Sequence, residues 1–193
     1  MRKLIVSEWI TLDGIFDGNT MAEWEMPYNS EDKVAFVRAG ILTSDALLLG
    51  RLTYEMLAAY WPAQKNNEMG WADWINSIPK YVVSSTLKKA EWNNSTIIKQ
   101  NVVEEITWLK QQPGNRILLS GSATLVQSLM GTGLIDAYEF LIHPVIMGRG
   151  KRFFKQEMSA VGLKLVKTQT FSSGVILLDY QPAELTATVS EVS

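Results

Sequence analysis

Apolar runs and amphipathic stretches alternate along most of the chain, in the order expected of an α/β domain. Residues 46–49 form a continuous apolar run, which is typical of a parallel strand buried on both faces. Val34, Val37 and Ile41 recur at helical spacing, so a helix should begin near Asn29 and Ser30. The pattern predicts further strands at residues 4–9, 81–84, 96–98 and 116–120. It predicts further helices before Pro62, between Asn101 and Pro113, and at residues 123–130.

The C-terminal third has a different pattern. Residues 138–145, 163–171 and 175–180 are strand-like, and Ser172-Ser173-Gly174 between the last two is typical of a hairpin. Residues 183–193 are mostly small and polar, as in a frayed tail. We therefore expect one α/β domain over residues 1–182, with a mostly parallel central sheet and antiparallel C-terminal strands.

Composition removes several classes of function. The chain has no cysteine and one histidine, so neither a disulfide nor a metal site is expected. Its net charge of −2 gives no sign of the basic face that nucleic acid requires. No apolar stretch approaches the roughly 20 residues of a membrane span, and the run before Glu8 is too short for a secretory signal. The sequence therefore predicts a cytoplasmic protein that binds neither nucleic acid nor a membrane.

Two strand-to-helix junctions carry a glycine followed by hydroxyl residues. Gly50 follows the apolar run 47–49 and precedes Thr53, and Gly121 follows the run 117–119 and precedes Ser122. Such junctions present backbone N–H groups and a helix N-terminus to a phosphate. A hydroxyl helix cap explains one junction equally well. Two junctions together suggest one shared anionic ligand, and a dinucleotide is the natural candidate.

Several segments occur in the order found in one protein family. They are Thr11-Leu12-Asp13-Gly14, Leu48-Leu49-Gly50-Arg51-Leu52-Thr53-Tyr54-Glu55, Tyr81-Val82-Val83-Ser84-Ser85-Thr86-Leu87, Ser120-Gly121-Ser122-Ala123-Thr124-Leu125 and Pro144-Val145-Ile146-Met147-Gly148-Arg149-Gly150. Together they resemble the dihydrofolate-reductase-like fold, a three-layer α/β architecture. The resemblance is stronger to the branch that contains the reductase domain of riboflavin biosynthesis and its bacterial relatives.

The resemblance implies an NADPH-dependent reductase. It assigns cofactor binding to Gly50, Arg51, Thr53, Ser84, Ser85, Thr86, Gly121, Ser122, Ala123 and Thr124. These residues follow the carboxyl ends of predicted strands, where open α/β sheets bind ligands. Individually each group has a simpler explanation; Arg51, for example, could pair with Glu55 four residues along the same helix.

The catalytic acid is predicted from a weaker match. Dihydrofolate reductases place a carboxylate on the first helix, and Asp32, four residues before Phe36, resembles it. Burial beside a nicotinamide would raise the pKa of such a group and suit it to proton transfer. Asp13 is the second candidate. The alternatives are that Asp32 complements the helix dipole and that Asp13 belongs to an ordinary Asp-Gly turn.

The resemblance suggests a small heterocyclic substrate of pterin or aminouracil type. The substrate of the riboflavin pathway carries a phosphate, and Lys33, Arg38 and Lys151-Arg152 are the cations expected near the substrate side. His143 is expected to be structural, and Trp24 or Trp61 could contact substrate. A homodimer is expected through residues 144–154, with Phe153 and Phe154 as exposed anchors. The alternative function is a nucleotide-binding protein of the same fold without catalysis.

Overall fold

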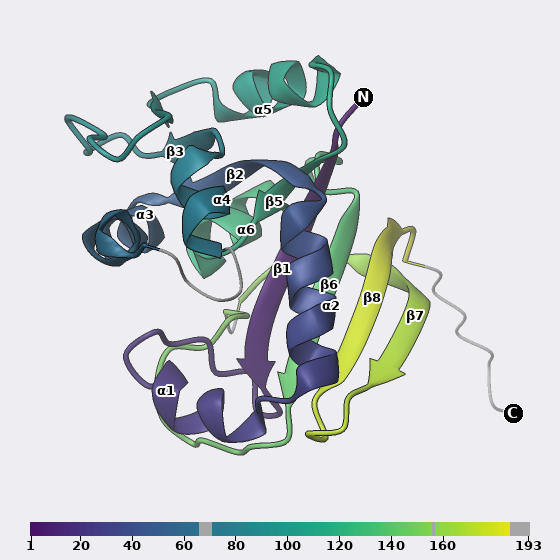
Figure 1. The fold of residues 1–193 in the computed structure, drawn as a ribbon. Coiled ribbons are helices and arrows are strands. Elements are labelled where there is room, and N and C mark those ends of the chain that lie inside the picture. The colour runs from purple at the N-terminus through teal and green to yellow at the C-terminus, as the bar shows by residue number, and fades with distance from the viewer. Residues whose placement is uncertain (66–70, 156, 186–193) are drawn as a thin grey trace, which may run out of the picture.

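A single eight-stranded sheet organises the protein in the computed structural model, which describes residues 1–65, 71–155 and 157–185 (Figure 1). The strand order is β4-β3-β2-β5-β1-β6-β8-β7. Strands β4 to β6 pair in parallel, whereas β8 and β7 pair antiparallel at one edge. The strands are β1 (Lys3–Thr11), β2 (Ser44–Gly50), β3 (Lys80–Val83), β4 (Ser95–Ile98), β5 (Arg116–Leu119), β6 (Ala137–His143), β7 (Gly162–Thr170) and β8 (Ile176–Ala183). The predicted mixed sheet is confirmed.

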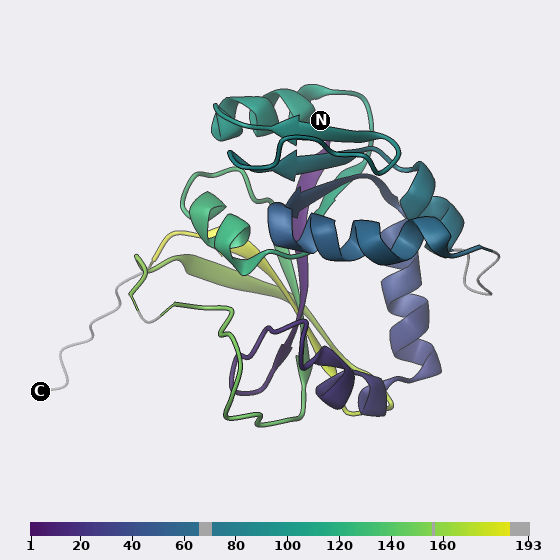
Figure 2. The ribbon, with the colours of Figure 1, turned by 90° about the vertical axis from the view of Figure 1, so that its left-hand side faces the viewer.

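Helices cover both faces of the sheet. They are α1 (Met21–Trp24), α2 (Glu31–Leu42), α3 (Arg51–Tyr60), α4 (Trp71–Ser77), α5 (Val102–Gln111) and α6 (Ala123–Leu129), with the 3₁₀ turns η1 (Met26–Tyr28) and η2 (Trp61–Ala63). Figure 2 shows α2 and α6 on opposite sides of β1. None of the helices in the described ranges is long and apolar enough to cross a membrane.

The apolar run in β2 is continuous because both faces of this strand are buried. Ala46 and Leu48 pack in the core beneath α5 and α6. Leu47 and Leu49 pack on the other face, together with residues of α3 and α4. This arrangement confirms the buried parallel strand predicted from the run, and it gives the three layers that the family resemblance implies.

Strand β1 extends beyond its neighbour β5. The two strands pair from Lys3 to Val6 of β1, after which the chain of β5 turns toward α6. The remainder of β1 keeps β6 as its partner, with Thr11 opposite His143. Residues 7–11 of β1 therefore lie where the glycine junction after β5 leaves the sheet.

Three local predictions need correction. The predicted loop at residues 11–29 contains α1 and η1. Asn101 precedes α5 as predicted, but its φ of 52° is left-handed and its side chain makes no capping hydrogen bond. Strand β8 reaches Ala183, so the predicted tail begins later, and residues 186–193 lie outside the described residues.

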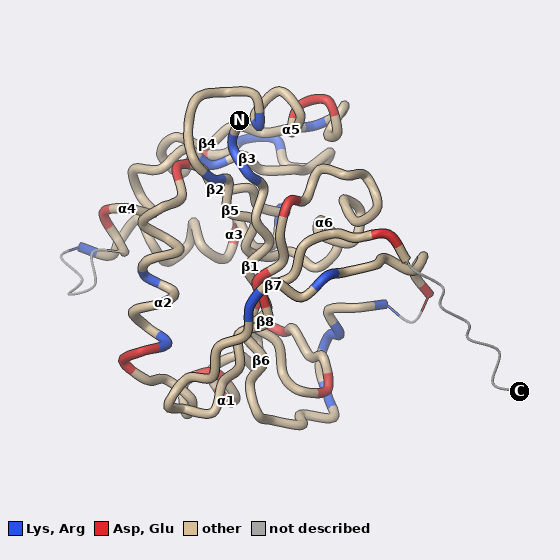
Figure 3. The backbone as a smooth tube through the Cα atoms, turned by 90° about the vertical axis from the view of Figure 1, so that its right-hand side faces the viewer, with Lys and Arg blue, Asp and Glu red and all other residues tan. Residues whose placement is uncertain are grey.

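Basic and acidic residues are interspersed along the backbone drawn in Figure 3. Several form pairs that tie separate elements together. Arg116 of β5 pairs with Glu139 of β6, and Lys110 of α5 pairs with Asp136 before β6. These charges therefore serve local pairing between elements.

Candidate active site

The two glycine junctions meet at the carboxyl ends of β2 and β5, which are neighbouring parallel strands. A Cβ atom on Gly50 would lie 2.7 Å from the Cβ of Ser122. A Cβ atom on Gly121, whose φ is +60°, would lie 2.7 Å from Oγ1 of Thr53. Both distances are too short for a real side chain, so glycine permits the close approach at both positions. The structure thus brings together four of the residues predicted to bind cofactor.

The first turns of α3 and α6 start from this contact. The backbone N–H groups of a helix's first turn have no partner within the helix, so they are free to bind an anion. Ala123 and Thr124 occupy these positions in α6, and Arg51 and Thr53 occupy them in α3. The Gly121 N–H is different, because it donates to the carboxylate of Glu8 at 2.7 Å. Gly121 therefore contributes close approach, whereas its N–H points into the protein.

The serine-rich loop after β3 has one buried and two exposed hydroxyl residues. The Ser84 hydroxyl oxygen accepts hydrogen bonds from the N–H groups of Thr86 at 3.2 Å and Leu87 at 2.9 Å. This side chain closes its own turn, while Ser85 and Thr86 are exposed. The loop follows the same edge of the sheet as Gly50, since β3 pairs with β2. Ser84 shapes the loop, and its two neighbours face solvent.

Arg51 is engaged by Glu55. Its guanidinium donates to both carboxylate oxygens, at 2.9 and 3.1 Å, on the exposed side of α3. The sequence left this pairing open as the alternative to phosphate binding, and it is the arrangement in the structure. A pocket of about 770 Å³ adjoins the pair and is lined by Tyr54, Glu55, Leu87 and Trp92, among others.

Glu8 is a buried carboxyl group that the sequence analysis did not identify. It lies on β1, is 2% exposed, and accepts the hydrogen bond from Gly121. Burial raises its pKa to about 8, and the Gly121 N–H offsets this only in part, so the group is mostly neutral at pH 7. A sequence signal existed: Leu4, Val6, Glu8 and Ile10 alternate along β1, and a carboxyl group interrupts an otherwise apolar face.

A second polar group lies on the opposite face of β1, against α2. Lys33 of α2 is 1% exposed and forms an ion pair with Glu25 at 2.9 Å. The Nζ atom of Lys33 lies 5.4 Å from the centre of the Trp9 ring. Trp24 and His143 are fully buried beside this pair, with ring centres 5.1 Å apart. Trp24 therefore belongs to this cluster.

Trp61, the other tryptophan considered for substrate contact, lies elsewhere. It forms the start of η2 after α3, and its ring packs edge-on against Tyr60 at 5.2 Å between centres. It also joins the cluster of apolar side chains on the α3 and α4 face of the sheet. Its contacts are those of a side chain that anchors α3 to the sheet.

Asp32 is an exposed ionised group, so the prediction of a buried acid with a raised pKa is wrong. Its oxygens accept hydrogen bonds from the N–H and the hydroxyl group of Ser172, at 2.8 and 2.9 Å. Hydrogen bonds from Ser30 and Ser172 lower its pKa to about 2. Asp32 thus ties the start of α2 to the turn between β7 and β8.

Asp13 also holds a loop. Its carboxylate accepts hydrogen bonds from the hydroxyl group of Thr11 and from the N–H groups of Met147 and Gly148. The bond from Thr11 contributes most to lowering its pKa, to about 2. The residue therefore fastens the segment after β6 onto the turn after β1. At neutral pH it accepts hydrogen bonds and has no proton to donate.

Phe153 is fully buried, so the expected exposed pair of phenylalanines is wrong for this residue. Its ring packs edge-on against Phe16 and Phe140, with ring centres 5.5 and 5.6 Å apart. It fills the core beside β6, where it covers Phe140. Phe154 is 43% exposed and Ile146 is 75% exposed. These two side chains are the apolar groups that the segment presents to solvent.

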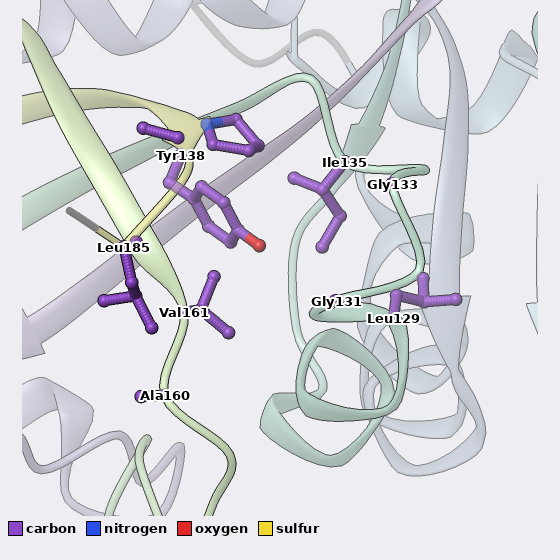
Figure 4. A pocket seen from close by; sticks show the side chains of 11 residues that line it. Leu129, Gly131, Gly133, Ile135, Tyr138, Ala160, Val161 and Leu185 are labelled. Atoms are coloured by element: carbon purple, nitrogen blue, oxygen red, sulfur yellow. The ribbon is translucent and has the colours of Figure 1, made fainter. Parts of the chain in front are cut away.

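An apolar pocket of about 320 Å³ lies apart from the glycine junctions (Figure 4). It is formed by the C-terminal end of α6, the start of β6, the start of β7 and the end of β8, including Leu129, Ile135, Tyr138 and Val161. The Gly121 junction is at the N-terminal end of α6, and the Gly50 junction is at the N-terminal end of α3. This pocket therefore belongs to a different part of the molecule.

Glu8 should make folding stability depend on pH. The unfolded chain loses this proton near pH 4.5, whereas the folded protein keeps it to about pH 8. Its stabilising contribution is therefore complete below pH 4.5 and is lost as the pH rises to 8. In the unchanged protein the unfolding free energy should decrease as the pH rises from 5 to 9. In Glu8→Gln this decrease should be smaller by more than about 2 kcal/mol. Urea unfolding measures this, with Glu31→Gln as the exposed control; identical pH dependence in Glu8→Gln and the unchanged protein would contradict it.

Comparison with known proteins places the chain in a family. A family model described as the RibD C-terminal domain matches residues 2–177. The uncharacterized protein YyaP of Bacillus subtilis is 32% identical over 182 residues, which cover 93% of this chain and 94% of that protein.

Solved structures show the same fold. A protein from Shewanella sp. PV-4 ascribed to riboflavin biosynthesis is 19% identical with a TM-score of 0.74, over 95% of this chain and 100% of that one. A dihydrofolate reductase from Enterococcus faecalis, complexed with NADP(H) and RAB-propyl, is 15% identical with a TM-score of 0.61, over 94% and 97%. The fold is therefore dihydrofolate-reductase-like, and the chain belongs to the RibD C-terminal domain family, a family of reductase type.

Proposed function

We propose that this protein is an NADPH-dependent reductase that transfers hydride to a small heterocycle of pterin or aminouracil type. The observation that carries the proposal is the contact between the Gly50 and Gly121 junctions at the carboxyl ends of β2 and β5. It places the first turns of α3 and α6 side by side, as binding of one pyrophosphate requires. Membership of a reductase-type family supports the same reading.

The cofactor would be held from three segments. First-turn amides of α6, at Ala123 and Thr124, would bind the pyrophosphate, together with the hydroxyl groups of Ser122 and Thr53. Ser85 and Thr86 would face the adenosine side. When bound, NADPH supplies the hydride, and the role of these residues is to orient it at the carboxyl ends of the strands.

Nucleotide binding without turnover is the second candidate. It is favoured by the lowered pKa values of Asp13 and Asp32, because neither residue can donate a proton at neutral pH. The two functions differ in one measurement. NADPH binding followed by its oxidation against a panel of pterins and aminouracils supports the reductase. Binding without oxidation of NADPH supports the second candidate, and absence of binding rejects both.

Gly121 and Gly131 provide a matched pair of variants. Both have a positive φ, but a Cβ atom on Gly131 would meet nothing within 4 Å. Each change to alanine should cost about 1–2 kcal/mol of stability for the left-handed backbone. Gly121→Ala should also push Thr53 away and lower the affinity for NADPH at least tenfold. Gly131→Ala should bind NADPH with unchanged affinity. Fluorescence titration of NADPH measures this, and a folded Gly121→Ala variant with unchanged affinity would reject the site.

Arg51 should select NADPH over NADH. Only the Nη1 group of Arg51 donates to Glu55 in the described contacts, so the other guanidinium N–H groups would be the ones to contact the 2′-phosphate. A charge-assisted hydrogen bond contributes about 1.5–3 kcal/mol, so the preference should be about tenfold to hundredfold. Arg51→Ala should remove most of this preference, because it should lower the affinity for NADPH and leave that for NADH unchanged. Glu55→Gln should leave the affinity for NADPH unchanged or higher. Equal affinities for the two cofactors in the unchanged protein count against this assignment.

The protein should form a homodimer through residues 144–154. Ile146 and Phe154 are the exposed apolar side chains of this segment, and a two-fold interface can be built from one such patch. Phe154→Ser should weaken the dimer, whereas Trp108→Ser, on the exposed face of α5, should not. Sedimentation at micromolar concentration measures the oligomeric state, and a monomeric unchanged protein rules out a stable pair.

A further inference from the structure

The apolar pocket of about 320 Å³ lies at the opposite end of the sheet from the glycine junctions. Its lining includes the start of β6, at the amino-terminal end of the parallel strands, whereas the junctions follow the carboxyl ends of β2 and β5. Apart from Tyr138, the described residues that line it have apolar side chains or are glycines, and none is charged. Pockets of this volume and lining are typical of small-molecule sites. The pocket is therefore separate from the place proposed for the cofactor.

Glycines shape two walls of this pocket. Figure 4 shows Gly131 and Gly133 on one side of it and Val161 on the other. A Cβ atom on Gly131 or Gly133 would meet nothing within 4 Å, so this turn leaves space beside the start of β6. On the other side, a Cβ atom on Gly162 would lie 2.5 Å from the carbonyl oxygen of Ala183, so glycine lets the start of β7 approach the end of β8. The backbone on both sides therefore leaves a space that its own side chains do not fill.

Tyr138 brings a hydrogen-bonding side chain into the pocket. The residue is 2% exposed, and its ring stacks on Phe140, with the ring centres 5.9 Å apart and the planes 20° apart. Figure 4 shows the ring directed into the space between Val161 and Ile135. In the described parts of the chain its hydroxyl group has no hydrogen-bond partner, although a buried tyrosine hydroxyl usually has one. The stacked ring thus holds an unpaired hydroxyl group inside an apolar space.

The chemistry of the lining defines the ligand that the pocket fits. Burial raises the pKa of Tyr138 to about 12, so the phenol keeps its proton at neutral pH and can donate a hydrogen bond. A charged ligand would be buried without a partner of opposite charge, which is costly. The surrounding side chains, among them Leu129, Ile135 and Val161, favour an apolar body. A neutral acceptor on a compact apolar molecule therefore matches this lining.

We propose that this pocket is a second ligand site, which binds a compact, neutral and mostly apolar molecule with one hydrogen-bond acceptor such as a carbonyl oxygen. The Tyr138 hydroxyl group donates to that acceptor, and the apolar side chains of the pocket enclose the rest of the molecule. The site is independent of the proposed reductase function, because it lies at the other end of the parallel strands.

Acetophenone and ethylbenzene form a matched pair of probes, since they have the same shape and differ in one carbonyl group. In an NMR titration of the full chain, both should shift the amide signals of Gly131, Gly133 and Gly162. Tyr138→Phe removes only the hydroxyl group. It should lower the affinity for acetophenone about twofold to tenfold and leave that for ethylbenzene unchanged. Benzoate, which resembles acetophenone in shape but is an anion, should not shift these signals.

Further variants control for changes elsewhere in the protein. Val161→Phe should fill the pocket and abolish binding of both probes, whereas Val166→Phe, at a position of β7 that is 52% exposed, should leave both affinities unchanged. Tyr60→Phe, at an exposed tyrosine of α3, should also leave them unchanged. Tyr138→Phe removes no hydrogen bond of the unliganded protein, so this variant should remain folded even if Val161→Phe does not.

Several results would overturn the proposal. One is acetophenone that shifts none of the three glycine signals, and another is an unchanged acetophenone affinity in Tyr138→Phe. Displacement of acetophenone by NADPH would assign the probe to the cofactor edge instead. Binding that appears only in a Val189→Asp, Val192→Asp variant would assign the pocket to the chain's own C-terminal residues, and binding that appears only on dilution would assign it to a second copy. Acetophenone bound equally with and without NADPH, together with the expected effect of Tyr138→Phe, supports the second site.

Discussion

The close approach of the loops after β2 and β5 is the constraint on which the candidate site depends. Parallel pairing of the two strands brings their carboxyl ends together, and glycine at positions 50 and 121 lets Ser122 and Thr53 pack against the opposing backbone. Any side chain at either glycine would separate α3 from α6. The separation of these two helix starts decides whether their free amides can act on one ligand. Backbone geometry therefore sets the shape of this edge of the sheet.

Strand β1 divides the site because its side chains alternate between two faces. Glu8 points toward the α6 side and accepts the N–H of Gly121, whereas Trp9 faces α2 and the Lys33 cluster. Both faces are buried, but the polar groups on them differ in charge. The pKa of Glu8 is raised by burial, so it is neutral, while Lys33 is kept beside a carboxylate. Two adjacent residues of β1 thus contact the Gly121 junction on one face and the Lys33 cluster on the other.

Much of the fold could be predicted because it depends on local patterns. The continuous run in β2, the turn at residues 172–174 and the glycine junctions are each visible within a few residues. The site depends on contacts between distant residues, and these were missed. Asp32 binds Ser172 and Glu8 binds Gly121, across 140 and 113 positions of sequence. A spacing of four before Phe36 identified Asp32 as an acid but contained no information about the hairpin that engages it.

Lys33 shows how a sequence signal can be present but lead to no prediction. It precedes Val37 and Ile41 by four and eight residues, so it shares the apolar face of α2. A cation on that face must find a buried partner, but the pattern cannot say that Glu25 supplies it from the α1–η1 segment. Leaving one charge of such a pair buried alone costs about 3–5 kcal/mol, whereas replacing both charges by apolar groups is often neutral. Removing Glu25 alone would therefore cost far more than replacing the whole pair. That energetic asymmetry holds Glu25, and with it the α1–η1 segment, on Lys33 of α2.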